Sequence, residues 1–419
     1  MRIERCKGCR DLSPEQMVNF RLIEGVFLNC CLKWGYQEVR TPTLEYLHLF
    51  TATGTLTPGM LGKVYSFLDW DGWSGQRVVL RPDATIPVAR LYIESRQERD
   101  VAKLCYVANS FIFEETGSEN RERWQCGAEL VGSNSTLANV ELISLALEVL
   151  RKLGLEGVRV RLSHAGVIKA LLSKLELSPG EQNKVFDRLL DGDATVLADL
   201  RPGKPELVKM MRLLLDMKGK SSGFLKNIKA LIGDSLSELE PPLDDFIGTC
   251  DLLEELGFSY QVDLASGRGF EYYTGMIFHL FVGDDNIGGG GRYDALIPLM
   301  GGKETAAAGF ALYIDRLMNL IEPKKPLKSR VGKVLVRVKP QMAREAFAVA
   351  QSLRDAGLVA EFSLDNGRPD GCGWTLDVEG KEGKFVLTDL GSRQRFTAAS
   401  PAEVLKILGV EDVAEDSTA

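Results

Sequence analysis

Five short polar segments carry residue types that bind ligands or move protons. They read LRPDAT from Leu80, RERWQCGAE from Arg121, GRGFEYYTG from Gly267, GGGGRYD from Gly288 and GFALYIDRL from Gly309. Each is weak evidence alone, because paired tyrosines are ordinary in a strand and an Arg-Tyr-Asp run fits a surface ion pair. The four glycines lack the spacing of a dinucleotide-binding fingerprint and the lysine of a P-loop. They predict either a close approach of the backbone to a ligand or a flexible turn.

The elements that must position these segments begin with a helix. Ser13-Pro14-Glu15-Gln16 has the capping serine, the early proline and the glutamine of a helix start. Apolar residues at helical spacing then predict a helix over residues 14–34. Strand-like and turn-like pieces alternate from there to Gly132, with Pro42 interrupting the first, which predicts antiparallel hairpins.

The longest predicted hairpin spans residues 109–132, NSFIFEETGSENRERWQCGAELVG. Its ends are apolar and its middle is charged and contains Gly117, so the tip is expected to reach into solvent or over a ligand. Residues 165–250 appear helical almost throughout. Strands return after Phe258, and the pattern predicts a last helix of this part from about Ala308.

The end of the chain differs in composition. Residues 323–331 are rich in proline and lysine and predict a linker. Residues 332–409 alternate strand and helix patterns and predict a small α/β domain. Residues 410–419 are acidic and predict a disordered tail.

Composition limits the class of protein. The chain is 45% hydrophobic and 26% charged, as soluble globular proteins are, and its net charge of -7 gives no overall basic footprint for nucleic acid. No apolar signal-peptide core and no window of about 20 apolar residues is present, so we expect a cytoplasmic protein without a membrane partner. Cys6 and Cys9 form a lone C-x-x-C, which lacks the second pair of a zinc site. We therefore expect reduced thiols, no metal and no cofactor.

Taken in this order, the five segments resemble the histidyl-tRNA synthetase family, over roughly residues 5–322. The family contains the synthetases and the regulatory subunits of ATP phosphoribosyltransferase. KGCRDLSP resembles its opening and GYQEVRTPTLE its class II motif 1. LRPDAT and GRGFEYYTG resemble the two histidine-pocket motifs, and the last two segments resemble the run into motif 3.

The resemblance implies an α+β fold, a class II aminoacyl-tRNA synthetase-like antiparallel sheet of six or seven strands flanked by helices. Residues 1–164 and 251–322 would form this core, interrupted by a helical insertion at residues 165–250. The small C-terminal α/β domain would follow the linker. Motif 1, with the helix at residues 14–34, would supply a broad apolar face for a two-fold dimer.

The resemblance also implies a complete amino acid pocket. The α-amino group would meet Asp83 and Thr85, and the carboxylate would meet Arg268. Glu129 and Tyr273 would reach the two imidazole nitrogens, since a carboxylate and a phenol can satisfy a ring with one donor and one acceptor. Gln125 and Tyr272 would lie beside them. The alternative is that Glu129 and Arg268 form a buried ion pair. RPDAT, with aspartate at Asp83, is closer to the regulatory subunits than to the synthetases.

The hairpin at residues 109–132 resembles motif 2, which in class II synthetases folds over ATP. Its first strand bears an arginine there, and in this chain that position falls on Phe111 or Ile112. Losing a preorganised charged donor at a reacting centre costs about 10²–10³ in rate. Tyr313 also places bulk where motif 3 has a small residue. Residual nucleotide contacts fall on Arg121 and Arg316, and no catalytic residue is assigned.

These residues imply a synthetase-like protein that kept the amino acid site and lost the chemistry. We therefore expect a non-catalytic regulatory subunit of ATP phosphoribosyltransferase. It would be required by a short-form catalytic subunit in the first step of histidine biosynthesis and would mediate feedback inhibition by histidine. The expected assembly is a homodimer within a hetero-oligomer, without tRNA.

Two alternatives stay open. The first is an active histidyl-tRNA synthetase, supported by the C-terminal domain and opposed by the missing motif 2 arginine. The second is a synthetase paralogue that senses amino acids or uncharged tRNA without a partner enzyme. A neighbouring gene for a short phosphoribosyltransferase would separate the second from the leading interpretation.

Overall fold

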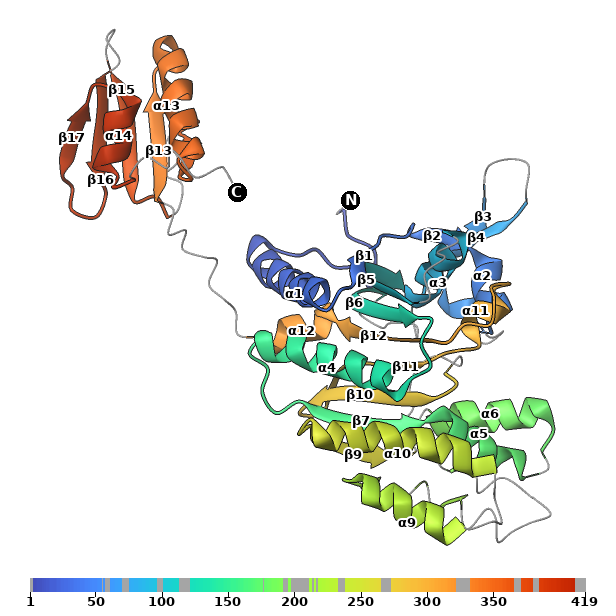
Figure 1. The fold of residues 1–419 in the computed structure, drawn as a ribbon. Helices are drawn as coiled ribbons and strands as arrows, with labels where there is room; N and C mark the ends of the chain where they lie inside the picture. The colour runs from blue at the N-terminus through green and yellow to red at the C-terminus, as the bar shows by residue number, and fades with distance from the viewer. Residues whose placement is uncertain are drawn as a thin grey trace. The chain divides into compact units, whose positions relative to one another are not determined.

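The chain forms two compact units, residues 1–323 and residues 324–419. The structure is a computed structural model (Figure 1). The residues it describes are 3–54, 56, 61–69, 75–95, 101–112, 121–175, 177–190, 195–196, 211–212, 215, 218–232, 238–264, 273–321, 332–364, 371–379 and 384–410.

The first unit is built on a nine-stranded sheet with the order β1-β5-β6-β12-β11-β10-β7-β9-β8. In that order the strands are Gln37–Glu38, Ala102–Phe111, Glu122–Val131, Ala307–Tyr313, Asp285–Arg292, Met276–Val282, Arg159–His164, Tyr260–Asp263 and Lys218–Gly219. The six central strands, β5 to β7, pair antiparallel. At the edges, β1 pairs with β5 and β9 pairs with β7 in parallel. The predicted antiparallel core is confirmed, but the whole sheet is mixed and larger than the six or seven strands expected.

Four helices lie along one face of this sheet (Figure 1). Their order in space is α1 (Pro14–Lys33), α12 (Ile314–Leu320), α4 (Thr136–Lys152) and α10 (Glu240–Glu255). Helix α1 starts as predicted, with a complete capping box between Ser13 and Gln16. Its apolar side, which includes Ile23 and Phe27, is buried in the chain's own core. This side of α1 belongs to the chain's own core, and the use of motif 1 for a dimer stays a prediction.

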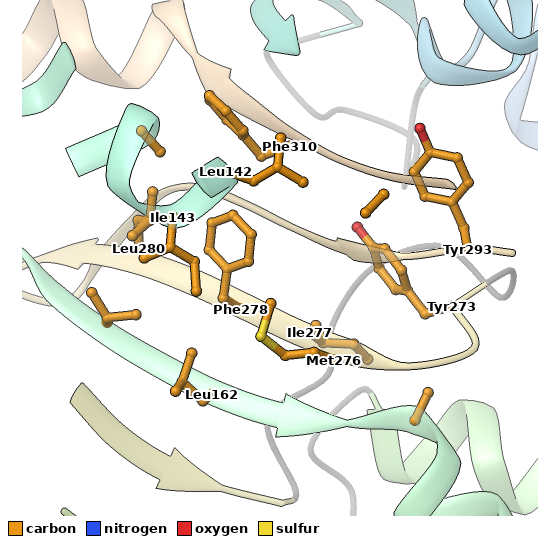
Figure 2. Close-up of a cluster of buried hydrophobic side chains, with 14 of the residues drawn as sticks. Leu142, Ile143, Leu162, Tyr273, Met276, Ile277, Phe278, Leu280, Tyr293 and Phe310 are labelled. Atoms are coloured by element: carbon orange, nitrogen blue, oxygen red, sulfur yellow. The ribbon is translucent and has the colours of Figure 1, made fainter. Parts of the chain in front are cut away.

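The core between these helices and the sheet is aromatic at its centre. The ring of Phe310 on β12 packs edge-on against Phe27 and tilted against Phe278, with ring centres 6.4 Å apart in both pairs. Figure 2 shows Leu142 and Ile143 of α4 over the same strands. This packing covers one face of the sheet, and the opposite face carries the candidate site.

The opposite face is covered in part by α3 (Thr85–Glu94), which contacts β6 and α11 (Leu296–Leu299). A second, three-stranded sheet has the order β2-β4-β3, formed by Leu44–Tyr46, Arg77–Leu80 and Ser66–Leu68. Helix α2 (Leu47–Ala52) and the short η1 (Leu61–Lys63) complete this part. Pro42 lies between β1 and β2 and so interrupts the strand, as predicted.

Residues 165–250 contain α5 (Ala165–Ser173), α6 (Pro179–Leu190), α9 (Ser222–Ile232) and most of α10. The segment also supplies the two-residue strand β8, which pairs with β9 at the sheet edge. That residues 165–250 form an independent insertion domain stays a prediction.

The prediction of a helix from about Ala308 is wrong about where the helix starts. Residues 307–313 form the central strand β12, and helix α12 begins at Ile314. The alanines there favour a helix locally. The strand forms because Ala307 and Ala308 are buried and Gly309 lies against β6 and β11, so tertiary packing decides the conformation.

The second unit has a five-stranded sheet with the order β14-β13-β15-β16-β17. Its strands in that order are Val359–Phe362, Lys333–Val338, Trp374–Glu379, Lys384–Asp389 and Arg395–Ala398. Helices η3 (Pro340–Met342), α13 (Ala343–Asp355) and α14 (Pro401–Ile407) accompany them. The unit has its own apolar core, centred on residues such as Val336, Leu353 and Leu387.

Within the described ranges, no helix has the length and apolar character needed to cross a membrane. The described residues also contain no group of three or more His, Cys, Asp or Glu side chains placed to hold a metal ion.

Candidate ligand-binding site

The site is built on strand β6, whose side chains alternate between the two faces of the sheet. Cys126, Ala128 and Leu130 point into the core beneath the helices. Gln125, Gly127 and Glu129 therefore point to the opposite face. This alternation brings a buried amide and a buried carboxylate onto one surface, with a glycine between them.

Glu129 is the centre of a buried polar cluster, with 1% of its surface exposed. Its Oε1 accepts hydrogen bonds from Thr85 Oγ1 at 2.8 Å and from Tyr106 Oη at 3.3 Å. Its Oε2 accepts a hydrogen bond from the hydroxyl of Tyr293. Three elements far apart in sequence thus converge on one carboxyl group.

Tyr106 on β5 fills the space over Gly127. A Cβ atom at Gly127 would overlap the end of this ring, so the position requires glycine. The amide of Gln125 donates to the Tyr106 oxygen at 3.2 Å, and Tyr106 donates to Glu129. Tyr106 therefore connects the two polar residues of β6 across the glycine between them.

The floor of the site consists of glycines on two further strands. A Cβ atom at Gly309 of β12 would overlap Glu129 Oε2, and one at Gly291 of β11 would lie 2.9 Å from the ring of Tyr273. The run of four glycines is thus part of strand β11 and not the flexible turn that was the alternative. Figure 2 shows Tyr273 and Tyr293 near one another at one end of the apolar cluster.

Asp83 enters the site from the segment before α3. Its Oδ1 accepts a hydrogen bond from the backbone N–H of Ile86 at 3.0 Å, so it caps the start of that helix. The arginine in the same segment, Arg81, donates to backbone and side-chain oxygens of Asn109 and Thr41. Arg81 therefore fixes the loop beside the hairpin.

Burial dominates the electrostatics of the cluster. Burial raises the pKa of the Glu129 carboxyl to about 8 and that of Asp83 to about 6. Hydrogen bonds donated to the two carboxyl groups lower these pKa values, but by less than burial raises them. Burial also raises the pKa of Tyr106, Tyr273 and Tyr293 well above the usual range. The three phenols are therefore neutral donors at physiological pH.

The structure brings five of the predicted pocket residues to one buried region: Asp83, Thr85, Gln125, Glu129 and Tyr273. Arg268 and Tyr272 lie outside the described residues. The ion pair between Glu129 and Arg268 that formed the alternative thus stays untested. That these residues bind an amino acid stays a prediction.

Two tyrosines of the cluster were missed from the sequence, Tyr106 and Tyr293. Tyr293 lies in the GGGGRYD segment, where its neighbours Arg292 and Asp294 do form an ion pair at 3.0 Å. Arg292 is buried and also bonds Asn139, whereas Asp294 is partly exposed, so the pair is half-buried and differs from the surface ion pair that was the alternative. Tyr106 could have been found from the register of the hairpin, which places it opposite Gly127.

The predicted hairpin at residues 109–132 is formed by β5 and β6, paired from Ala102 with Val131 to Phe111 with Glu122. Ile112 continues the pairing through its N–H, which donates to the carbonyl of Arg121 at 3.1 Å. The two positions where a synthetase places its arginine, Phe111 and Ile112, are both partly buried. Their side chains can donate no hydrogen bond. The tip, residues 113–120, lies outside the described residues.

The two arginines assigned to residual nucleotide contacts lie apart from the Glu129 cluster. Arg121 lies across Gly8 and donates to the hydroxyl of Tyr65 at 3.3 Å. Arg316 lies over the ring of Tyr313 and donates to the carbonyl of Asn286.

Comparison with known families agrees with this arrangement. The family model described as histidyl-tRNA synthetase matches residues 8–317. Among solved structures, one from Bacillus halodurans titled an ATP phosphoribosyltransferase regulatory subunit/histidyl-tRNA synthetase has a TM-score of 0.73 at 24% identity and covers 88% of this chain and 95% of its own. The apo histidyl-tRNA synthetase of S. aureus has a TM-score of 0.69 at 21% identity, with 97% and 99% covered. These structures establish the class II synthetase-like fold.

Sequence relatives divide into two groups. An ATP phosphoribosyltransferase regulatory subunit of Dehalococcoides mccartyi strain BAV1 is 53% identical over 98% of this chain and 99% of its own length. A histidine–tRNA ligase of Methanosarcina acetivorans is 33% identical over 98% of this chain and 100% of its own. The chain therefore belongs to the histidyl-tRNA synthetase family and, within it, to the ATP phosphoribosyltransferase regulatory subunits.

Proposed function

We propose that this chain is the histidine-binding regulatory subunit of an ATP phosphoribosyltransferase and catalyses no reaction of its own. One contrast supports the proposal: five of the predicted pocket residues share the buried region around Glu129, while the hairpin strand beside it has Phe111 and Ile112 at the positions of the synthetase arginine. A family member with this contrast keeps a site for an amino acid and lacks the charged donor for adenylate formation.

The ligand we assign to the cluster is histidine. Its imidazole ring would meet Glu129 and Tyr273, and its ammonium group would meet Asp83 and Thr85. Asp83 is suited to this role because its carboxylate can accept charge-assisted hydrogen bonds from an ammonium group. A pocket of buried polar groups rejects side chains that leave those groups unpaired, at about 1–3 kcal/mol per group.

The partner we assign is a short-form catalytic subunit that joins ATP and phosphoribosyl pyrophosphate in the first step of histidine biosynthesis. This chain would be required for its activity and would pass on inhibition by histidine. Inhibition requires two states of the complex that differ in histidine affinity, since a ligand shifts an equilibrium only through differential binding. The proposed assembly is a homodimer within a hetero-oligomer.

Reconstitution tests the proposal. A purified short-form catalytic subunit should gain phosphoribosyltransferase activity when this full-length chain is added, and histidine should lower the activity of the mixture. Light scattering at micromolar concentration should give a dimer for this chain alone and a larger species with the partner. An unchanged catalytic rate in a mixture that forms a complex would contradict the proposal.

A further inference from the structure

The carboxyl group of Glu129 is surrounded by hydroxyl donors. Thr85 and Tyr106 donate to one oxygen and Tyr293 donates to the other. The Tyr106 oxygen accepts from the amide of Gln125, which leaves its own proton directed at Glu129. Three donors converging on one carboxyl group are the arrangement that stabilises a carboxylate anion.

A cation to balance that anion is not found among the described residues. Neither Glu129 nor Asp83 has an ion-pair partner in this part of the chain. Among the described arginines, Arg81 lowers the pKa of Asp83 but less than burial raises it, and its guanidinium is bonded to Asn109 and Thr41. The neighbouring Asp83 adds a like charge that makes ionisation of Glu129 harder.

In the part of the chain that the structure describes, the remaining titratable groups facing Glu129 are phenols, while Arg268, expected beside the pocket, lies outside that part. Tyr106 comes from β5, Tyr273 precedes β10 and Tyr293 follows β11, and burial keeps all three neutral. Helix α3 faces Glu129 with the hydroxyl of Thr85, and strand β12 faces it with Gly309. Burial without a cation raises the pKa of Glu129 to about 8, so the empty site holds its carboxyl protonated at pH 7.

We propose that Glu129 stores one proton in the empty site and passes it to the basic ring of the incoming ligand, which is then held as an imidazolium against the Glu129 carboxylate. This inference rests on the proposed binding of histidine. The O–H bond of the carboxyl group breaks and a ring N–H bond forms, so no proton enters or leaves the complex at neutral pH. The three hydroxyl donors then stabilise the carboxylate, and the ring supplies the missing cation.

The transfer means that the site selects its ligand by the basicity of the ring as well as by its shape. A ring without a basic nitrogen, such as that of phenylalanine, gives Glu129 no acceptor for its proton, and the buried carboxyl group stays unpaired toward the ligand. A ring that accepts the proton forms a charge-assisted bond, which is about twice as strong as a neutral one. The ligand class is therefore amino acids with a weakly basic heteroaromatic ring.

Nitrogen NMR of ring-labelled histidine bound to the full-length chain at pH 8 tests the transfer. Free histidine has a neutral ring at this pH and an imidazolium at pH 5, and the two spectra serve as references. We expect both ring nitrogens of the bound ligand to match the imidazolium reference. A bound ring that matches the neutral reference would overturn the inference and leave histidine binding intact. The absence of any bound signal at millimolar histidine would instead overturn the proposed histidine site.

The Glu129→Gln variant removes the stored proton and keeps the shape of the side chain, so any histidine it binds should have a neutral ring at pH 8. Glu304→Gln, at an exposed carboxylate, is the matched control and should bind the imidazolium. If Glu129→Gln binds too weakly, calorimetry of the wild type in buffers of different ionisation enthalpy tests whether Glu129 holds the proton before binding. Proton uptake on binding should rise by about two thirds of a proton between pH 7 and pH 8.5, because a group with a pKa of about 8 loses that much over this range, and a constant count would contradict the stored proton.

Discussion

The guanidinium of Arg316 lies over the ring of Tyr313, with its central carbon 5.2 Å from the ring centre. The same guanidinium donates to the carbonyl of Asn286. Arg316 is the arginine of motif 3 by resemblance, and here it is engaged by a ring and a carbonyl of its own chain. Together with the apolar Phe111 and Ile112, these contacts support the proposal that the chain keeps the amino acid side of the family's site and lacks the nucleotide side.

Replacing Glu129 with alanine should weaken histidine binding by at least tenfold. The change leaves a ring nitrogen of the ligand unpaired, and three hydroxyl donors lose their acceptor; each buried unpaired group costs about 1–3 kcal/mol. Titration calorimetry measures the affinity, and circular dichroism checks that the variant is folded. Glu304→Ala, at an exposed position, should bind as the wild type does. Equal affinity of Glu129→Ala and the wild type would contradict the pocket assignment.

Replacing Gly309 with alanine should displace the Glu129 carboxyl group without changing its chemistry. The added Cβ overlaps Glu129 Oε2 and lies close to the carbonyl of Ala128, so the side chain must move. Overpacking of this kind costs about 1–3 kcal/mol in the free energy of unfolding, and histidine binding should weaken as well.

Gly25→Ala is the matched control for that variant. Gly25 is exposed on α1 and a Cβ there meets no atom within 4 Å. The control should bind histidine normally and unfold at higher urea concentration, because alanine in a helix is about 0.5–1 kcal/mol more favourable than glycine. Normal histidine binding by Gly309→Ala would show that the position of the Glu129 carboxyl group does not matter.

The sequence predicted the start of α1, the hairpin and five members of the buried cluster, because each depends on local pattern or on a motif. The capping box at Ser13 and the alternation along β6 are local signals. The strand at Ala307 was missed because burial against two neighbouring strands overrides the helix preference of alanine. Tyr106 was missed for a related reason: only the pairing register shows that it lies over Gly127 and between two polar residues.

The free energy of unfolding should fall as pH rises from about 6.5 to about 8, above the range in which the buried His279, whose pKa is lowered to about 4, contributes a slope of opposite sign. Glu129 has a pKa of about 8 in the folded chain, against an ordinary value of 4.5, so in this window the folded protein keeps a proton that the unfolded chain has lost. Asp83, at about 6, acts in the same direction at the acid end. The slope from one such group is at most about 1.4 kcal/mol per pH unit.

Urea unfolding at several pH values measures that slope in the wild type and in Glu129→Gln. The variant carries no titrating group at this position, so its profile should be flatter between pH 6 and pH 8. Glu304→Gln should keep the wild-type slope, since an exposed carboxylate is ionised in both the folded and the unfolded chain throughout this range. Identical profiles for all three proteins would mean that Glu129 is already ionised in the empty site.

The chain should support no histidine-dependent exchange of pyrophosphate into ATP and no charging of tRNA. Phe111 and Ile112 give the α-phosphate no donor as charge develops, and such a loss costs about 10²–10³ in rate. Arg121 does not replace it, because its side chain lies across Gly8 and reaches Tyr65. Exchange at even about a hundredth of an ordinary synthetase's rate would favour the alternative of an active enzyme.

Restoring the arginine tests whether its loss, or the bulk of Tyr313, accounts for the expected lack of exchange activity. Ile112→Arg supplies the donor, but the Tyr313 ring under Arg316 still occupies the position of the small motif 3 residue. We therefore expect the single variant to gain less exchange activity than Ile112→Arg combined with Tyr313→Gly. Tyr313→Gly alone, which removes the ring without adding a charge, is the matched control and should stay inactive. Activity in that control would place the block at Tyr313 and not at the hairpin strand.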